Sequence, residues 1–365
     1  MHYIRFLKPP KLSFATGRKA SISAVVTVTS DLGESFFAGE LNLVSSALSG
    51  DKIIAQKDCN WNPGARALKI ELDVGHVKFS WPIRIHVGLD RERLVDIFNE
   101  PEKSSSGNSL PTVISAWSSR LDPQNPDAAK KVERRVHLLS GPVVGIWEET
   151  GESIARHIWD AGVALTSYFD RIVSLQDPGL PQLNKLITES LAGRRKINVI
   201  ELGSGCGVVG IGLAHVLSNC EVLLTDLPEA EEIMTTNLSC LSPKVHSRVS
   251  FKVLDWEENL PSPCTTKRFD LILVADCTYN PDSTPALVKT LSALVAASPS
   301  AVIVVAMKVR HQSEAIFFTL MESAGFAQSG HYAIPLPREA SLDDYEEEEL
   351  EKADLFTFQS RGMIS

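Results

Sequence analysis

The chain has 365 residues, of which 44% are hydrophobic and 22% are charged, and this is enough for two packed domains. A formal net charge of −9 argues against a nucleic-acid partner, and no apolar run is long enough to span a membrane. The six cysteines show no Cys-x-x-Cys pair and no metal-ligand spacing, which favours free thiols in a reducing compartment and no bound metal. Residues 1–14 lack the apolar region of a signal peptide, so we expect a soluble cytoplasmic protein, with the nucleus as an open alternative.

Residues 1–98 have the pattern of a small all-β domain, either a sandwich or a barrel. Runs of β-branched residues separated by turn residues predict strands at 21–30, 36–44, 52–57, 67–74 and 77–89. His2, His76 and His86 stand alone in the sequence and are expected to be structural, while Trp61 and Trp81 are expected to fill a core. The domain is therefore interpreted as a scaffold or, alternatively, as a docking site for a partner or substrate protein.

Residues 99–132 are predicted to form a linker, because residues 99–128 concentrate Ser, Pro, Asn and Gly. A strand-like stretch at 133–149 then leads into a second domain, which we place at 133–365.

The second domain alternates between strand and helix patterns. Helices are predicted at 153–172, 181–193, 228–240, 283–297 and 313–324, and strands at 220–226, 248–256, 269–276, 301–309, 326–334 and 355–359. The acidic stretch 343–352 is most simply a solvated loop, with attraction of a basic substrate segment as the alternative. This order predicts an α/β fold, a doubly wound and mostly parallel sheet that binds its ligand at the carboxyl ends of the strands.

A glycine turn lies at the centre of this domain, in the stretch NVIELGSGCGVVGIGLA at 198–214. An apolar strand leads into Gly203-Ser204-Gly205, and residues at helical spacing follow. Glycines allow a sharp turn and let a ligand approach the backbone amides at the start of the helix. A bare Gly-x-Gly also occurs in dinucleotide sites and in turns that bind nothing, so the following strand ends have to separate these readings.

Carboxylates follow the next strands of the domain. Asp226 ends one strand at the position where a ribose diol needs an acceptor, although it could instead cap a helix. Asp255 and Trp256 end another and offer an acceptor and a stacking face for a purine, although Trp256 could simply pack against a helix start. The stretch carries no Gly-Lys-Ser/Thr, which argues against a polyphosphate. Together these residues predict a site for an adenine nucleoside.

The second domain resembles the seven-strand S-adenosylmethionine-dependent protein-lysine methyltransferases, the group that includes the valosin-containing-protein lysine methyltransferase. The resemblance covers about residues 140–360, and it rests on the ordered set IWDAGVALTSYF, ELGSGCGVVGIGLA, TDLPE, LDW and ADCTY. It implies a methyltransferase that uses S-adenosyl-L-methionine and methylates a lysine side chain of a protein. Residues 1–130 lie outside the resemblance, so the substrate cannot be carried over.

The resemblance also implies a role for each residue of these motifs. It places Gly203, Ser204 and Gly205 along the cofactor backbone, Asp226 at the ribose, Asp255 and Trp256 at the adenine, Glu201 near the methionine amine, and Trp159 and Ala275 as further cofactor contacts. Asp276 and Tyr279 belong to an Asp-x-x-Tyr signature beside the methyl group and the target amine. A carboxylate stabilises a charged amine, so we assign Asp276 and Tyr279 to substrate binding and orientation of the lone pair rather than to strong base catalysis.

Four other functions compete with this reading. A nucleic-acid methyltransferase is disfavoured, because the stretch 276–279 lacks the Asn/Asp-Pro-Pro-aromatic pattern and the chain is acidic. A small-molecule methyltransferase and a non-catalytic interaction protein on the same fold stay open. A nicotinamide oxidoreductase would explain the glycines and Asp226 but would leave Asp255 and Trp256 without a role.

Overall fold

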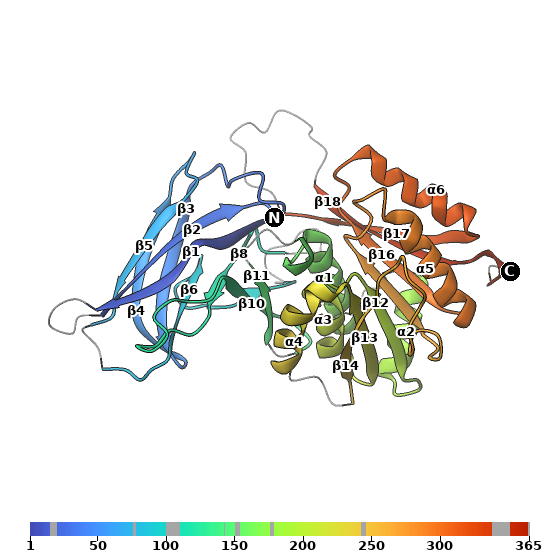
Figure 1. Cartoon of the computed structure of the whole chain (residues 1–365), viewed down its shortest axis with the longest axis horizontal. Helices are drawn as coiled ribbons and strands as arrows, with labels where there is room; N and C mark the ends of the chain where they lie inside the picture. Colours follow the sequence, from blue (N-terminus) through green and yellow to red (C-terminus); the bar gives the residue numbers. More distant parts are fainter. Residues whose placement is uncertain are drawn as a thin grey trace.

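A computed structural model describes residues 1–14, 20–75, 78–99, 110–141, 143–149, 154–175, 179–241, 246–337 and 351–363. Two parts lie side by side in Figure 1, a β-rich part in blue to green and an α/β part in green to red. Among the described residues, no helix is both long and apolar enough to cross a membrane.

The N-terminal part consists of two sheets. The first has the order β5 (Leu68–Asp73), β2 (Ala20–Thr29), β1 (His2–Phe14), β8 (Val113–Ile114). The second has the order β11 (Val143–Glu149), β10 (Lys131–His137), β9 (Ala116–Ser118), β6 (Ile83–Gly88), β3 (Leu41–Ser49), β4 (Lys52–Trp61), with β7 (Asp96–Ile97) beside β10. One hydrophobic cluster joins Ile22 and Val26 of the first sheet to Trp61 and Ile85 of the second, so the two sheets share a core.

The predicted linker is wrong where the structure describes it. Residues 100–109 lie outside the described part, but β8, β9 and the start of β10 fall within 110–132 and belong to the two sheets. The stretch 133–149, expected to open the second domain, supplies β10 and β11 of the second β-sheet. The reason is burial: Trp117 is 4% exposed and Ala116 is fully buried, so a segment of polar composition is fixed by a few apolar residues.

Other elements of the β-domain are close to expectation. The strands predicted at 52–57 and 67–74 correspond to β4 and β5, whereas the one predicted at 36–44 lies further along the chain as β3. Strand β1 was missed, because its Lys8, Pro9 and Pro10 interrupt the β-branched pattern. Trp61 and His86 are buried, as predicted for structural residues, and His76 lies outside the described residues.

The second part contains a mixed seven-stranded sheet. Its order is β14 (Arg248–Val253), β13 (Cys220–Asp226), β12 (Ile197–Leu202), β15 (Leu271–Ala275), β16 (Val302–Met307), β18 (Lys352–Ser360), β17 (Phe326–Pro335). The first five strands run parallel, and β18 is antiparallel to both β16 and β17. Strand β15 lies in the middle and is buried along nearly its whole length, in agreement with its continuous apolar sequence.

Helices cover both faces of this sheet. They are α1 (Asp160–Leu175), α2 (Pro181–Leu191), α3 (Val208–Val216), α4 (Glu231–Ser239), α5 (Thr284–Ala297) and α6 (Ile316–Ser323), with short 3-10 turns η1 (Ile154–Arg156), η2 (Pro228–Ala230), η3 (Gln312–Ala315) and η4 (Arg361–Met363). Alternate residues of β12 serve the two faces: Val199 packs with α1 to α4, and Ile200 packs with α5 and α6. The helix expected at 153–172 begins later, so Trp159 lies just before α1 instead of within it.

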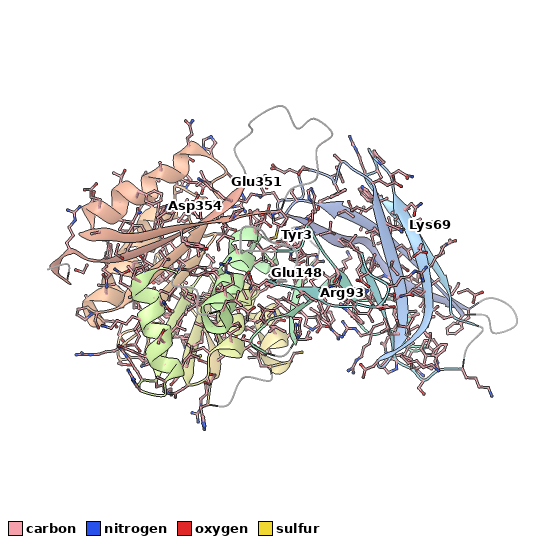
Figure 2. All side chains as sticks on the ribbon, turned by 180° about the vertical axis from the view of Figure 1, so that it is seen from behind. Tyr3, Lys69, Arg93, Glu148, Glu351 and Asp354 are labelled. Carbon is pink, nitrogen blue, oxygen red and sulfur yellow. The ribbon has the colours of Figure 1, made fainter. Side chains whose placement is uncertain are left out.

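The two parts share a hydrophobic core. Tyr3 and Ile146 of the β-domain belong to the same buried cluster as Phe169 of α1 and Leu355 of β18. Buried polar groups cross the same junction: the Tyr3 hydroxyl donates to Asp160 Oδ1 over 2.8 Å, and Glu148 Oε2 of β11 accepts the backbone N–H of Ile158 over 2.9 Å. Figure 2 shows Tyr3 and Glu148 where the two parts meet. The β-domain is therefore packed into the structure rather than tethered to it.

Candidate functional site

A cavity of about 560 Å³ opens where β12, β13 and β15 end. The eleven residues singled out from the sequence all line it: Trp159, Glu201, Gly203, Ser204, Gly205, Asp226, Asp255, Trp256, Ala275, Asp276 and Tyr279. Other lining residues were missed by sequence reasoning, among them Ile154, His157, Glu229 and Cys277. Ile154 and His157 come from the turn before α1, which carries no motif of its own.

The glycine turn between β12 and α3 lies along one wall of the cavity. Gly203 and Gly205 have φ angles of +64° and +54°, in the left-handed region that favours glycine. A Cβ on Gly205 would lie 3.1 Å from the carbonyl oxygen of Ala155, and one on Gly203 would collide with Cys277 Sγ. Both positions therefore need glycine, for backbone conformation and for space.

Asp226 holds the glycine turn from the end of β13. Its Oδ2 accepts the backbone N–H of Gly205 over 2.6 Å, and its Oδ1 accepts that of Leu227 over 2.7 Å. Asp226 is therefore not the N-cap of η2, where Leu227 occupies that position without a side-chain cap. Burial raises the pKa of this carboxyl, and the two backbone N–H donors partly oppose the shift.

Glu201 lies under the turn, near the end of β12. Its Oε2 accepts the backbone N–H of Gly210 in α3 over 2.8 Å. Burial raises the pKa of Glu201 to about 8, against the opposing effect of the Gly210 N–H. This carboxyl is poised to ionise when a cation binds beside it.

Trp256 and Asp255 lie beyond β14 on the neighbouring wall. The Trp256 ring packs against Gly203, at a distance that would put a Cβ there 3.2 Å from the ring. Asp255 Oδ1 accepts the backbone N–H of Glu257 over 2.9 Å, so it also shapes the turn that carries it. The alternative role of Trp256, packing against the start of a following helix, does not apply, because Trp256 lies in a turn and no helix starts there.

Asp276 follows β15 with a φ of +54°, which is unusual for a residue with a side chain. Four hydrogen bonds reach its carboxylate, from Ala161 N at 3.1 Å, Lys308 N at 3.2 Å, and Arg310 Nη1 and Nη2 at 2.9 and 3.4 Å. Burial raises its pKa, and the Arg310 guanidinium opposes that shift. The sequence did not indicate Arg310, which lies far along the chain after β16.

The mouth of the cavity is apolar and exposed. Tyr279 is 49% exposed, Ile154 55% and Leu227 38%, and all three line the same cavity.

The lining of the cavity is acidic. Six carboxylates line it, those of Glu201, Asp226, Glu229, Asp255, Glu257 and Asp276. Among the described lining residues there is no lysine or arginine. The cavity therefore favours a cationic ligand over an anionic one.

The residues present fit an adenosyl sulfonium cofactor. Ser204 Oγ is buried and has no hydrogen-bond partner among the described residues. The glycine turn leaves room for a ligand backbone, and the carboxylates suit a ribose diol, an exocyclic amine and an ammonium group. No group of His, Cys, Asp and Glu in the described chain could hold a metal ion.

Comparison with known proteins agrees with this geometry. A family model described as lysine methyltransferase matches residues 139–324. The protein N-lysine methyltransferase METTL21A of Mus musculus is 32% identical over 187 residues, which cover 51% of this chain and 74% of that protein. The protein-lysine N-methyltransferase EFM6 of Saccharomyces cerevisiae is 27% identical over 212 residues, covering 52% and 82%.

A further relative extends over more of the chain. The UPF0665 family protein C23C4.06c of Schizosaccharomyces pombe is 27% identical over 333 residues, covering 87% of this chain and 92% of that protein. The segment matched by the family model contains every residue predicted for the cavity. The chain therefore belongs to the lysine methyltransferase family.

Proposed function

We propose that this enzyme binds S-adenosyl-L-methionine in the cavity and transfers its methyl group to a lysine side chain of a protein substrate. The observation that carries the proposal is the convergence of all eleven predicted residues on one acidic cavity. In a nicotinamide oxidoreductase, Asp255 and Trp256 beside the glycine turn would have no role.

The residues of the inner wall would hold the cofactor. Asp226 would accept the ribose hydroxyls, Asp255 and Trp256 would take the adenine, and Glu201 would face the ammonium group of the methionine part. Ser204 offers a hydroxyl that has no other partner among the described residues. Gly203, Gly205, Trp159 and Ala275 would supply close backbone and apolar contacts. When bound, the cofactor supplies a methyl group on a positively charged sulfur.

The attacking lysine must lose its proton before it can accept the methyl group. At an ordinary pKa of about 10.4, the neutral amine costs roughly 4–5 kcal/mol at pH 7. Desolvation in the cavity and a nearby positive charge both lower that cost, whereas a free carboxylate beside the amine would increase it. Asp276 reduces this penalty, because its carboxylate is already paired with the Arg310 guanidinium. We therefore assign Asp276 to shaping the turn 276–279 and Tyr279 to contact with the lysine.

The exposed rim supports a protein substrate. Tyr279, Ile154 and Leu227 present apolar surface at the mouth, where the hydrocarbon stem of a lysine and its neighbouring residues could pack. The β-domain gives a second possible contact surface, and docking of a substrate protein by residues 1–98 stays a prediction.

Two measurements test the proposal. Calorimetry with S-adenosylhomocysteine and with NAD separates a methyltransferase site from a dinucleotide site, and we expect binding of the first only. Incubation of the enzyme with a cell lysate and tritium-labelled cofactor should then place the label in protein, on lysine after hydrolysis. Label in RNA or in the small-molecule fraction would contradict the proposal, and so would binding without any transfer. Gly205→Arg provides the matched control, because it should fill the cofactor space.

A further inference from the structure

A bridge of charged residues connects the β-domain with the methyltransferase site. Asp31, in the turn after β2, accepts Arg310 Nη2 over 2.6 Å. The other nitrogen of the same guanidinium, Nη1, donates to Asp276 Oδ1 over 2.9 Å. We call Asp31, Arg310 and Asp276 the interdomain bridge. Its three side chains are 2%, 17% and 3% exposed, so solvent screens these contacts only weakly.

Arg310 is well suited to hold two carboxylates at once. Its planar fork has donors pointing in two directions, and a lysine at the same place would act only as a point charge. Its guanidinium also lies over the ring of Trp159, 5.7 Å from the centroid, and Trp159 lines the cavity. Burial alone would lower the pKa of Arg310, but Asp276 and Asp31 outweigh this effect and raise it. Arg310 therefore stays charged across the physiological pH range.

No other described cation replaces Arg310 at Asp276. The Lys308 Nζ ammonium pairs with Asp160 at 3.0 Å and Glu351 at 3.1 Å, and it lies 4.0 Å from Asp31 Oδ1. Lys308 reaches Asp276 only through its backbone N–H. Arg310 is thus the cationic side chain that orients the Asp276 carboxylate, together with the backbone N–H groups of Ala161 and Lys308. Asp31 is the second carboxylate that orients Arg310.

The turn that carries Asp31 is itself fixed by the β-domain. Arg5 of β1 donates to Thr29 Oγ1 at 2.8 Å, to the Ser30 carbonyl at 3.0 Å and to the Asp31 carbonyl at 2.7 Å. The Asp31 Oδ1 atom accepts the backbone N–H of Leu32 over 2.9 Å. One end of the bridge, Asp31, is therefore fixed by the β-domain, and the other end, Asp276, belongs to the turn 276–279.

We propose that Asp31 and Arg310 are positioning residues for methyl transfer, and that the β-domain completes the active site through them. The proposal rests on the function proposed above. Asp276 adopts a left-handed backbone conformation at the start of the turn that leads to Tyr279, and Arg310 supplies two of the four hydrogen bonds to its side chain. A shift of the carboxylate would move the turn that presents Tyr279 to the substrate. The bridge therefore affects kcat, whereas the affinity for the cofactor depends on other residues.

The test is a double-mutant cycle in the full-length enzyme. Asp31→Asn keeps the shape of the side chain and removes its charge, and Arg310→Met removes the guanidinium. We expect Asp31→Asn to lower kcat by about tenfold or more, since misplacement near the reacting atoms is costly. The affinity for S-adenosylhomocysteine, measured by calorimetry, should change less than about twofold because the cofactor residues are untouched. In the Arg310→Met background, Asp31→Asn should have almost no further effect on kcat.

Controls separate positioning from a general loss of stability. Ser167→Ala removes another buried contact between the two parts, the bond from Ser167 Oγ to Asn99 Oδ1 at 3.0 Å, and neither residue lines the cavity. This variant should lower the melting temperature without changing kcat. Arg310→Lys should recover part of the turnover lost in Arg310→Met, since it restores the charge but not the fork.

Either of two kinetic results would overturn the proposal: an unchanged kcat in folded Asp31→Asn, or losses of kcat from Asp31→Asn and Arg310→Met that multiply. A crystal structure of Asp31→Asn gives a readout that needs no turnover. Arg310 and Asp276 should move in it, and unmoved side chains would equally overturn the proposal. If the wild-type enzyme transferred no methyl group to lysine, the proposed function would fail, while this structural test would still decide the bridge.

Discussion

Glu201 Oε2 accepts the backbone N–H of Gly210 over 2.8 Å, so the carboxyl at the end of β12 is bonded to the helix that follows the glycine turn. A Cβ on Gly210 would lie 2.7 Å from that same oxygen, which shows how closely the strand and the helix pack. The contact buries Glu201 while leaving its side chain in the wall of the cavity. A carboxyl in this position has an ionisation state that depends on what occupies the cavity.

Cofactor affinity should depend on pH through Glu201. The pKa of about 8 in the ligand-free enzyme means that Glu201 is largely protonated at neutral pH. An ammonium group beside it favours the ionised form, so binding releases a proton and weakens as the pH falls below 8. The release of one proton raises Kd by at most about tenfold for each unit by which the pH falls. Calorimetry with S-adenosylhomocysteine between pH 6 and 8 measures this slope. In Glu201→Gln the slope should be flat, and a flat wild-type profile would count against the role of Glu201.

Substitution of Gly205 should abolish cofactor binding. Gly205→Arg forces a side chain into a left-handed position 3.1 Å from the Ala155 carbonyl and beside the Asp226 contact. We expect no measurable heat with S-adenosylhomocysteine and no methyl transfer, while the circular dichroism spectrum stays that of the folded wild type. Gly193→Arg is the matched control, because Gly193 also has a positive φ but has open space around it. Tight cofactor binding by Gly205→Arg would show that the turn does not border the cofactor.

Removal of the Asp276 side chain should separate binding from turnover. Asp276→Ala leaves Glu201, Asp226 and Trp256 in place, so S-adenosylhomocysteine should bind with a Kd within a few-fold of wild type. Methyl transfer should fall by on the order of a hundredfold, because the turn that carries Tyr279 loses its anchor. Single-turnover labelling of a protein substrate, with cofactor affinity measured in parallel, checks both parts. Full turnover in this variant would remove Asp276 from the site assignment.

The aromatic residue at the mouth should affect the substrate more than the cofactor. Tyr279 is 49% exposed, so Tyr279→Ala removes apolar surface from the rim with little effect on the fold. We expect a higher KM for the protein substrate and an unchanged KM for the cofactor. Tyr279→Phe keeps the ring and should keep most of the substrate affinity. Equal losses for both variants would indicate that the hydroxyl, rather than the ring, is the part that acts.

The buried ion pair between Arg134 and Glu148 should contribute strongly to the stability of the β-domain next to the junction. Arg134 also donates to the carbonyl oxygens of Ile4 and Ser115, each at 2.7 Å, so it ties β10 to β1 and to the link between β8 and β9. Arg134→Met leaves Glu148 buried without its cation, which should cost about 3–5 kcal/mol of unfolding free energy. Urea unfolding at neutral pH measures the loss. The control is Lys69→Met at the exposed pair with Glu71, seen far from the junction in Figure 2, which should leave the midpoint nearly unchanged.

The sequence predicted which residues lie together at the cavity more closely than it predicted the extent of the β-domain. Asp226 ends a strand, and Gly203, Trp256 and Asp276 follow strands. Parallel strands bring such positions together at one edge of a sheet. The local sequence pattern was therefore sufficient to predict that these residues lie close together. Which ligand atom each residue contacts stays a prediction.

The missed features depend on contacts between distant segments. Strands β8 and β9 are two and three residues long, too short to show a period, and they form because Trp117 and Ile114 find a core built by other strands. Arg310 lies 279 residues from Asp31, and neither stands in a motif. A single sequence gives no signal for such a pair, since only the folded arrangement brings the two charges together.

The shared core at the junction also sets an order of events during protein synthesis. Tyr3 is made long before its buried neighbours Phe169 and Leu355, yet all three belong to one cluster. Until the last strands leave the ribosome, the first strand keeps an apolar face without its final cover. A chaperone that shields the nascent sandwich would therefore act before the catalytic half exists.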